Sequence, residues 1–165
     1  MKKTKLIPLF VLPIFLFSGC IFSQDPSVNR PKVKSESTSI QENYNKEITV
    51  GTTKLFVEVA DTDSAREQGL SNRDSLASNN GMLFDFTNTS METPSFWMKG
   101  MKFNLDLIWI DKDHVTAITP NVPAPTAGQT NLPFYKTSQS VTHVLEVPAG
   151  FTDKNNIKVG DKVSL

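Results

Sequence analysis

Residues 105–118 read Leu105-Asp106-Leu107-Ile108-Trp109-Ile110, then Asp111-Lys112-Asp113-His114, then Val115-Thr116-Ala117-Ile118. The first and last of these runs are apolar, rich in β-branched residues, and of the length typical of strands. The middle run is polar and contains two aspartates, which favours a short hairpin loop. We therefore expect two antiparallel strands paired across this loop.

Strand signals continue on both sides of the hairpin, as short apolar segments separated by polar turns. We expect further strands at Glu47–Val50, Leu55–Val59, Met82–Phe86, Ser95–Met98, Val141–Val147 and Ile157–Leu165. Gly51 and Thr52 supply a turn between the first two. The sequence therefore predicts one mainly β domain over residues 46–165, a compact antiparallel barrel or sandwich.

One short helix is expected near residues 61–68. Asp61 and Thr62 are capping residues, Asp63 places an acid in the first turn, and Gly69 suits a left-handed end.

The segment Pro120–Gln139 holds four prolines and has little periodicity. A long irregular loop in a compact domain is often functional. It can equally cover the edge of a sheet, and the sequence leaves both interpretations open.

The first nineteen residues have the three parts of a secretory signal: a basic start, the apolar run Leu6–Phe17, and the small residues Ser18 and Gly19. As a helix, the apolar run would rise about 18 Å, which is short of the roughly 30 Å hydrocarbon core of a bilayer. We therefore expect a signal peptide over residues 1–19.

Cys20 is the only cysteine. With the preceding Ser18-Gly19 and the apolar run, it resembles the lipobox of bacterial lipoproteins, in which the cysteine is lipidated and becomes the first residue. Phe17 stands where that motif usually has leucine. Ordinary signal cleavage, which would leave Cys20 as a free thiol or remove it, is the alternative. The resemblance predicts an extracytoplasmic protein anchored to the membrane through acyl chains on Cys20.

Residues 20–45 are polar and nearly free of aromatic side chains. Such a segment buries too little surface to offset its ordering entropy, so we expect a flexible tether. The chain has 17 basic and 17 acidic residues, and removal of Lys2, Lys3 and Lys5 with the leader leaves 14 basic ones. A mildly acidic chain without a basic run is not expected to bind nucleic acid.

Several motifs, in the expected order, resemble the DUF192 family, also called UPF0127. They are Arg66–Leu70 with Arg73 (R-x-x-G-L…R), Gly81–Phe86 (G-M-L-F-x-F), the signature-like Phe96–Asp106, and the closing elements Val144–Gly150 and Gly160–Val163. The resemblance covers about residues 48–165. It implies a compact, mostly β domain with one short helix, and it implies no activity.

Three positions depart from that family. Gly100 and Met101 stand where many members have Asn and Thr, and Asn104 stands where they usually have Pro. If the Asn-Thr pair serves a ligand in those members, this chain lacks its polar groups.

A pocket is one hypothesis for the aromatic residues near Trp97, because alternate strand residues face opposite sides of a sheet and one set needs a cover. The candidate pocket residues are Arg66, Arg73, Trp97, Met98, Asp106 and Glu146, with Met82, Phe84, Met101 and Trp109 as further wall residues. The alternative is that both sets belong to the core. Burial of the Asp106 carboxylate in such an apolar run costs free energy unless the carboxylate is paired. We expect Arg66 or Arg73 as its partner, in a structural or a ligand-binding ion pair.

No G-x-S-x-G, H-E-x-x-H or P-loop motif occurs in the chain. This favours a membrane-tethered extracytoplasmic domain that acts as a binding or accessory module of the cell envelope. One alternative is an enzyme that acts on an envelope substrate through Asp106 and Glu146. Another is a Cu(I)-binding protein that uses Met98, Met101 and a histidine, since thioethers select Cu(I).

We expect the partners to be the membrane, through Cys20, and a small molecule or protein of the envelope. We expect no metal or other cofactor.

Overall fold

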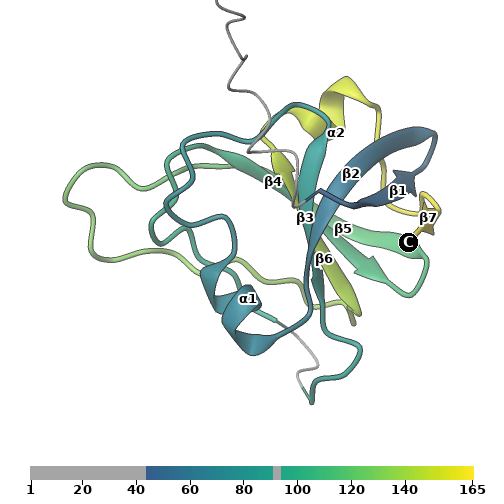
Figure 1. Cartoon of the computed structure of the whole chain (residues 1–165), viewed down its shortest axis with the longest axis horizontal. Helices are drawn as coiled ribbons and strands as arrows, with labels where there is room; N and C mark the ends of the chain where they lie inside the picture. Colours follow the sequence, from purple (N-terminus) through teal and green to yellow (C-terminus); the bar gives the residue numbers. More distant parts are fainter. Residues whose placement is uncertain (1–43, 91–93) are drawn as a thin grey trace, which may run out of the picture. The chain divides into compact units, whose positions relative to one another are not determined.

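The computed structural model describes residues 44–90 and 94–165 (Figure 1). The expected signal peptide and nearly all of the expected tether lie outside the described residues. The elements within them are β1 (Lys46–Val50), β2 (Thr53–Ala60), α1 (Asp63–Gln68), β3 (Asn80–Asp85), β4 (Leu105–Asp111), β5 (His114–Val122), β6 (His143–Pro148), α2 (Phe151–Lys154) and β7 (Val163–Ser164). In this part of the chain, no helix is both long and apolar enough to span a membrane.

The strands form one sheet in the order β5-β4-β6-β3-β2-β1-β7. Neighbouring strands are antiparallel except β2 and β3, which run parallel and are connected through α1. The two ends of the sheet approach one another, because the Val115 amide in β5 donates to the Asp161 carbonyl oxygen at 2.9 Å and the Gly160 amide donates to the Val115 carbonyl oxygen at 2.8 Å. The sheet is a curled half-barrel, which confirms the mainly β, barrel-like fold.

The curled sheet buries side chains on both faces. In β4, Ile108 and Ile110 belong to an inner core, whereas Leu107 and Trp109 belong to an outer core. The inner core joins β1, β5 and β7, the strands that the curl brings together. The outer core is covered by irregular segments that contribute Leu70, Met98, Met101, Ala124 and Tyr135. Because both faces of β4 are covered, a nearly uninterrupted apolar run fits this strand.

Most of the expected strands are confirmed, and the hairpin of residues 105–118 forms as predicted. The strand expected at Ser95–Met98 is wrong. Phe96 makes only an isolated bridge, in which its amide and that of Tyr135 each donate to the other residue's carbonyl oxygen at 2.8 Å. Gly100, with a φ of 73°, then turns the chain away.

The C-terminal region also differs from expectation. Only Val163–Ser164 of the expected Ile157–Leu165 strand is extended, because Gly160 has a φ of 93° and the Asp161 side chain closes a turn on the amide of Lys158 at 2.8 Å. The four-residue helix α2 was not expected. The strand β5 continues through Pro120 to Val122, so the irregular loop begins later than predicted.

The expected helix is α1. Its N-cap is Thr62, whose hydroxyl accepts from the Ala65 amide at 3.2 Å, and it ends at Gly69, whose φ is 49°. A Cβ at Gly69 would stand 3.4 Å from the Phe84 ring. The end of α1 therefore packs closely on the outer face of β3.

Candidate functional site

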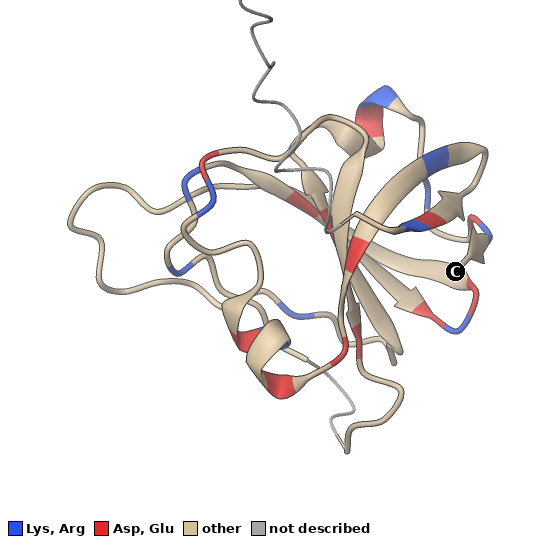
Figure 2. Cartoon of the chain, viewed as in Figure 1, with Lys and Arg blue, Asp and Glu red and all other residues tan. Residues whose placement is uncertain are grey.

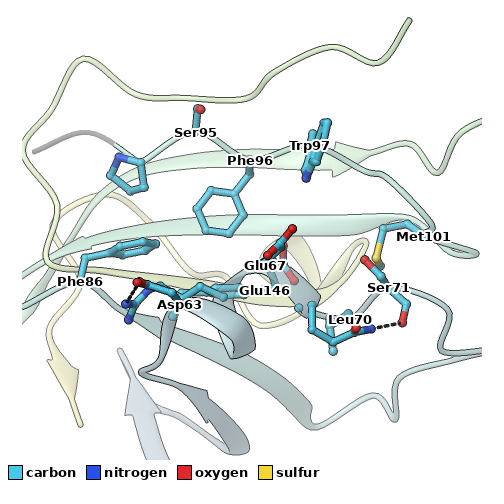
Figure 3. Close-up of a pocket in the computed structure, with 15 residues that line it drawn as sticks. Asp63, Glu67, Leu70, Ser71, Phe86, Ser95, Phe96, Trp97, Met101 and Glu146 are labelled. Atoms are coloured by element: carbon cyan, nitrogen blue, oxygen red, sulfur yellow. Dashed lines mark hydrogen bonds and ion pairs between the residues drawn. The ribbon is translucent and has the colours of Figure 1, made fainter. Parts of the chain in front are cut away.

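A cavity of about 260 Å³ lies on the outer face of the sheet, next to α1 (Figure 3). Its apolar wall consists of Leu70, Phe84, Phe86, Phe96, Trp97 and Met101, and its charged groups are Asp63, Arg66, Glu67 and Glu146. Pockets with mainly apolar and aromatic walls and a few polar groups are typical of small-molecule sites.

The aromatic wall is fixed by ring contacts. Phe96 packs edge-to-face on Phe84 with ring centroids 4.9 Å apart, and it also contacts Trp109 at 5.7 Å. Trp97 is 46 % exposed and stacks on Phe134 at 5.7 Å with an interplanar angle of 12°. The inner wall of the cavity therefore consists of aromatic rings packed against one another, with an accessible indole beside them.

Glu146 is the deep polar group of the cavity. In the register of the sheet it pairs with Met82 of β3 and Leu107 of β4, so its side chain shares their outer face. The residue is only 6 % exposed, and its side chain forms no hydrogen bond or ion pair with any residue of the described ranges. Its carboxyl oxygens are not fully sealed from solvent, since no fully buried side-chain oxygen in this part of the chain lacks a partner. Figure 3 draws its carboxyl group among the residues that line the cavity.

Burial raises the pKa of the Glu146 carboxyl to about 8, and the charge of Arg73 opposes this rise. Arg73 cannot neutralise Glu146 directly because it is engaged elsewhere. Its Nη2 lies 2.7 Å from Glu58 Oε2, and its Nη1 donates to the Tyr44 hydroxyl at 3.1 Å. Glu146 is therefore mainly protonated at neutral pH.

Arg66 comes from α1 and is also engaged. Its Nη2 lies 2.6 Å from Asp63 Oδ1, and its Nη1 donates to the Asp85 carbonyl oxygen at 2.8 Å. The guanidinium carbon lies 5.6 Å from the centroid of the Phe86 ring. Arg66 thus closes one side of the cavity with its charge already paired.

Asp106 does not belong to this cavity, and the ion pair expected with Arg66 or Arg73 is wrong. In β4, Asp106 pairs with Val147 of β6, one position away from Leu107 and Glu146, so it faces the inner side of the sheet. It is fully buried and accepts four hydrogen bonds: from the amides of Asn121, Gly150 and Thr152 at 2.8, 3.1 and 2.9 Å, and from the Thr152 hydroxyl at 2.7 Å. Asp106 and Glu146 therefore do not share a site.

The methionines and histidines lie apart. Met98 is 3 % exposed in the outer core, and Met101 follows it through a turn in which its amide donates to the Met98 carbonyl oxygen at 3.1 Å. His143 alternates with Val144 and Glu146 on β6, which places it on the other face. His114 lies in the exposed β4–β5 hairpin beside Asp113. The structure does not bring either histidine to the methionine pair.

The sequence model of the DUF192 family, described as "Uncharacterized ACR", matches residues 46–165. The chain belongs to the DUF192 family. No match was found among curated proteins.

The solved structures that resemble this DUF192 chain include one from Sinorhizobium meliloti and one from Novosphingobium aromaticivorans. One is a candidate transcription regulator from Sinorhizobium meliloti, with 30% identity, a TM-score of 0.64, and coverage of 74% of this chain and 95% of that chain. The other is a protein of unknown function from Novosphingobium aromaticivorans, with 26% identity, a TM-score of 0.64, and coverage of 72% of this chain and 84% of that one.

Four of the segments that carry the DUF192 resemblance meet at the cavity. The R-x-x-G-L segment supplies Arg66, Glu67 and Leu70, the G-M-L-F-x-F strand supplies Phe84 and Phe86, the signature supplies Phe96, Trp97 and Met101, and the segment 144–150 supplies Glu146. Gly81 allows the strands to approach, since a Cβ there would stand 2.8 Å from the Glu146 carbonyl oxygen.

Of the residues predicted for the pocket, Arg66, Trp97 and Glu146 line the cavity, whereas Arg73, Met98 and Asp106 do not. Phe86 was missed, although it follows directly after β3 and its alternation with Phe84 predicts the same face. Glu67 was missed because one acid on an exposed helix gives no signal.

Proposed function

We propose that this DUF192 chain is a membrane-tethered, extracytoplasmic binding module of the cell envelope, and that its ligand is a small molecule held in the Glu146 cavity. The observation that carries the proposal is that the carboxyl group of Glu146, a residue only 6 % exposed, has no partner among the described residues and borders an aromatic cavity. Burying such a group without a hydrogen bond costs free energy, and a ligand that reaches it would recover part of that cost.

The cavity supports binding better than catalysis. The enzyme alternative needs Asp106 and Glu146 together, but they face opposite sides of the sheet. Among the described residues, no histidine and no second buried acid lines the cavity with Glu146.

Small molecules extracted from the cell envelope should stabilise the full chain in detergent, because ligand at 100 times its Kd adds about 2.7 kcal/mol to the free energy of unfolding. We expect Tm to rise by several degrees in wild type and much less in Trp97→Ala, which removes the accessible indole. Val159→Ala, a change at a 62 % exposed residue outside the cavity, is the matched control. An equal rise in wild type and Trp97→Ala, or none in wild type, would contradict a ligand in this cavity.

The proposed membrane anchor is tested separately, at Cys20. Cells given radiolabelled fatty acid should label wild type and retain it in the membrane fraction, whereas Cys20→Ala should be unlabelled and released. Phe17→Leu, which restores the usual lipobox residue, should be labelled at least as well as wild type. Equal labelling of wild type and Cys20→Ala would refute the anchor.

A further inference from the structure

The cavity has an acidic bias. Its acids are Asp63, Glu67 and Glu146, and its one base among the described residues is Arg66. Asp63 neutralises Arg66 in an ion pair of 2.6 Å. Glu67, on the exposed helix α1, is the lining charge that remains, and the buried Glu146 adds a second negative charge when it ionises; the acids of α1 appear in red in Figure 2.

The aromatic rings add a second attraction for positive charge, because the face of an aromatic ring carries negative potential. Two cationic side chains of the protein already lie over aromatic rings of the cavity. Arg66 lies 5.6 Å from the Phe86 centroid, and Lys99 Nζ lies 5.0 Å from the Trp97 centroid. The inner ring Phe96 has no such side-chain cation among the described residues.

We propose that the cavity binds a small organic ammonium ion, whose positive charge pairs with the Glu146 carboxylate between the aromatic walls. This rests on the proposed function, in which the cavity is a ligand site. A bound anion would be repelled by Glu67 and, once it ionises, by Glu146, while the Arg66 charge is paired with Asp63. Lys99 lies over the Trp97 ring at the edge of the cavity and is not one of its lining residues. A neutral ligand could form a hydrogen bond with the Glu146 carboxyl but would gain no charge attraction from it or from the aromatic ring faces.

Binding of a cation beside Glu146 should be coupled to the loss of a proton from the Glu146 carboxyl. Glu146 is mainly protonated at pH 7 because burial raises its pKa to about 8. The ammonium ion pairs with the ionised form, so the carboxyl group releases one proton to solvent as the ion binds. The charged groups around it are Glu67 and the Arg66–Asp63 pair on α1, and the Arg73–Glu58 pair next to β2. Both arginines are paired, so neither substitutes for the ligand.

Three probes of similar size test the sign of the charge: choline, its neutral carbon isostere 3,3-dimethylbutanol, and the anion 3,3-dimethylbutyrate. Titration calorimetry would measure each against the full chain in detergent between pH 6 and pH 9. We expect choline to bind most tightly, with Kd falling about tenfold per pH unit up to about pH 8. Buffers of different ionisation enthalpy should report close to one proton released per choline at pH 7.

Substitutions at cavity residues test whether choline binds in this cavity. Glu146→Gln should weaken choline binding at least tenfold at pH 8 and abolish its pH dependence. Trp97→Ala should weaken it severalfold, Glu67→Gln only slightly, and Val159→Ala not at all. Thermal unfolding of each variant would confirm that it is folded.

The outcomes separate the two proposals. If the isostere or the anion binds as tightly as choline at pH 8 and Trp97→Ala weakens it, the cavity is a ligand site and the ammonium proposal is wrong. If choline binds equally to wild type and Glu146→Gln, the ammonium proposal is also wrong. If none of the probes binds, the ammonium proposal fails, while a Tm rise with envelope extract would still support the cavity as a ligand site.

Discussion

Replacing Asp106 by alanine should lower the free energy of unfolding by about 3–5 kcal/mol, since it removes a buried acceptor and leaves its four donors unsatisfied, at a cost of about 1–3 kcal/mol for each buried group. The carboxylate is fully buried and ties the amide of Asn121, near the end of β5, to those of Gly150 and Thr152 at the start of α2. Alanine would leave three amides and a hydroxyl without their acceptor. Urea unfolding at pH 7 measures the effect.

Asp153→Ala is the control for that experiment, because Asp153 is an exposed acid in α2. Its effect should stay within about 0.5 kcal/mol, as for most surface substitutions. If Asp106→Ala unfolds at the same urea concentration as wild type, Asp106 does not hold these elements together. Choline binding by Asp106→Ala under conditions where it is folded should match wild type, because Asp106 faces away from the cavity.

The second large effect is on pH dependence: the contribution of Glu146 to the free energy of unfolding should fall as pH rises. The folded-state pKa of Glu146 is raised to about 8 from the ordinary value of 4.5, so the native state holds a proton that the unfolded state has lost. Stability is therefore greatest below the unfolded pKa and declines as pH approaches the folded pKa, by about 1.4 kcal/mol per unit within that window. Glu146→Gln, which carries no titrating group, should lack this decline.

The difference between wild type and Glu146→Gln isolates this effect. Burial lowers the pKa of His143, so its contribution to stability rises with pH in part of the same range. Because His143 is present in both proteins, its contribution cancels. Urea unfolding should be measured at several pH values between 5 and 9. The free energy of unfolding of Glu146→Gln should rise relative to that of wild type with each step toward pH 8. Parallel curves would mean that Glu146 titrates normally.

The sequence predicted local pairings well and long-range neighbours poorly. The β4–β5 hairpin was predictable because apolar runs and a polar loop lie within fourteen residues of one another. The hydrogen-bond partners of Asp106 were not predictable, because Asp106 accepts from Gly150 and Thr152, which follow it in the sequence by 44 and 46 residues. The helix α2 has only four residues, too few to show a helical period.

The cavity was partly predictable. Arg66, Trp97 and Glu146 were candidate residues, but the sequence could not show which of the carboxylates Asp106 and Glu146 faces the aromatic side. That choice depends on the register between β4 and β6, where a shift of one residue exchanges the two faces. The same register places Met82, Glu146 and Leu107 in one row across the outer face.

Met101 shows how this chain departs from its family resemblance. It stands where many DUF192 members have Thr, and it lines the cavity. A thioether in place of a hydroxyl removes a hydrogen-bonding group from the wall, which leaves Glu146 as the main polar group at depth. Binding of the proposed ligand should therefore depend more on charge and aromatic contact than on hydrogen bonds.

The central claim is that Glu146 is a buried, neutral acid that a cationic ligand converts to its charged form. A carbon-detected NMR titration of the Glu146 carboxyl, assigned by comparison with Glu146→Gln, measures this directly in the full chain. The pKa of the Glu146 carboxyl should be about 8 without ligand and clearly lower in saturating choline. A free-protein pKa near the ordinary 4.5, or a pKa that choline leaves unchanged, would contradict it.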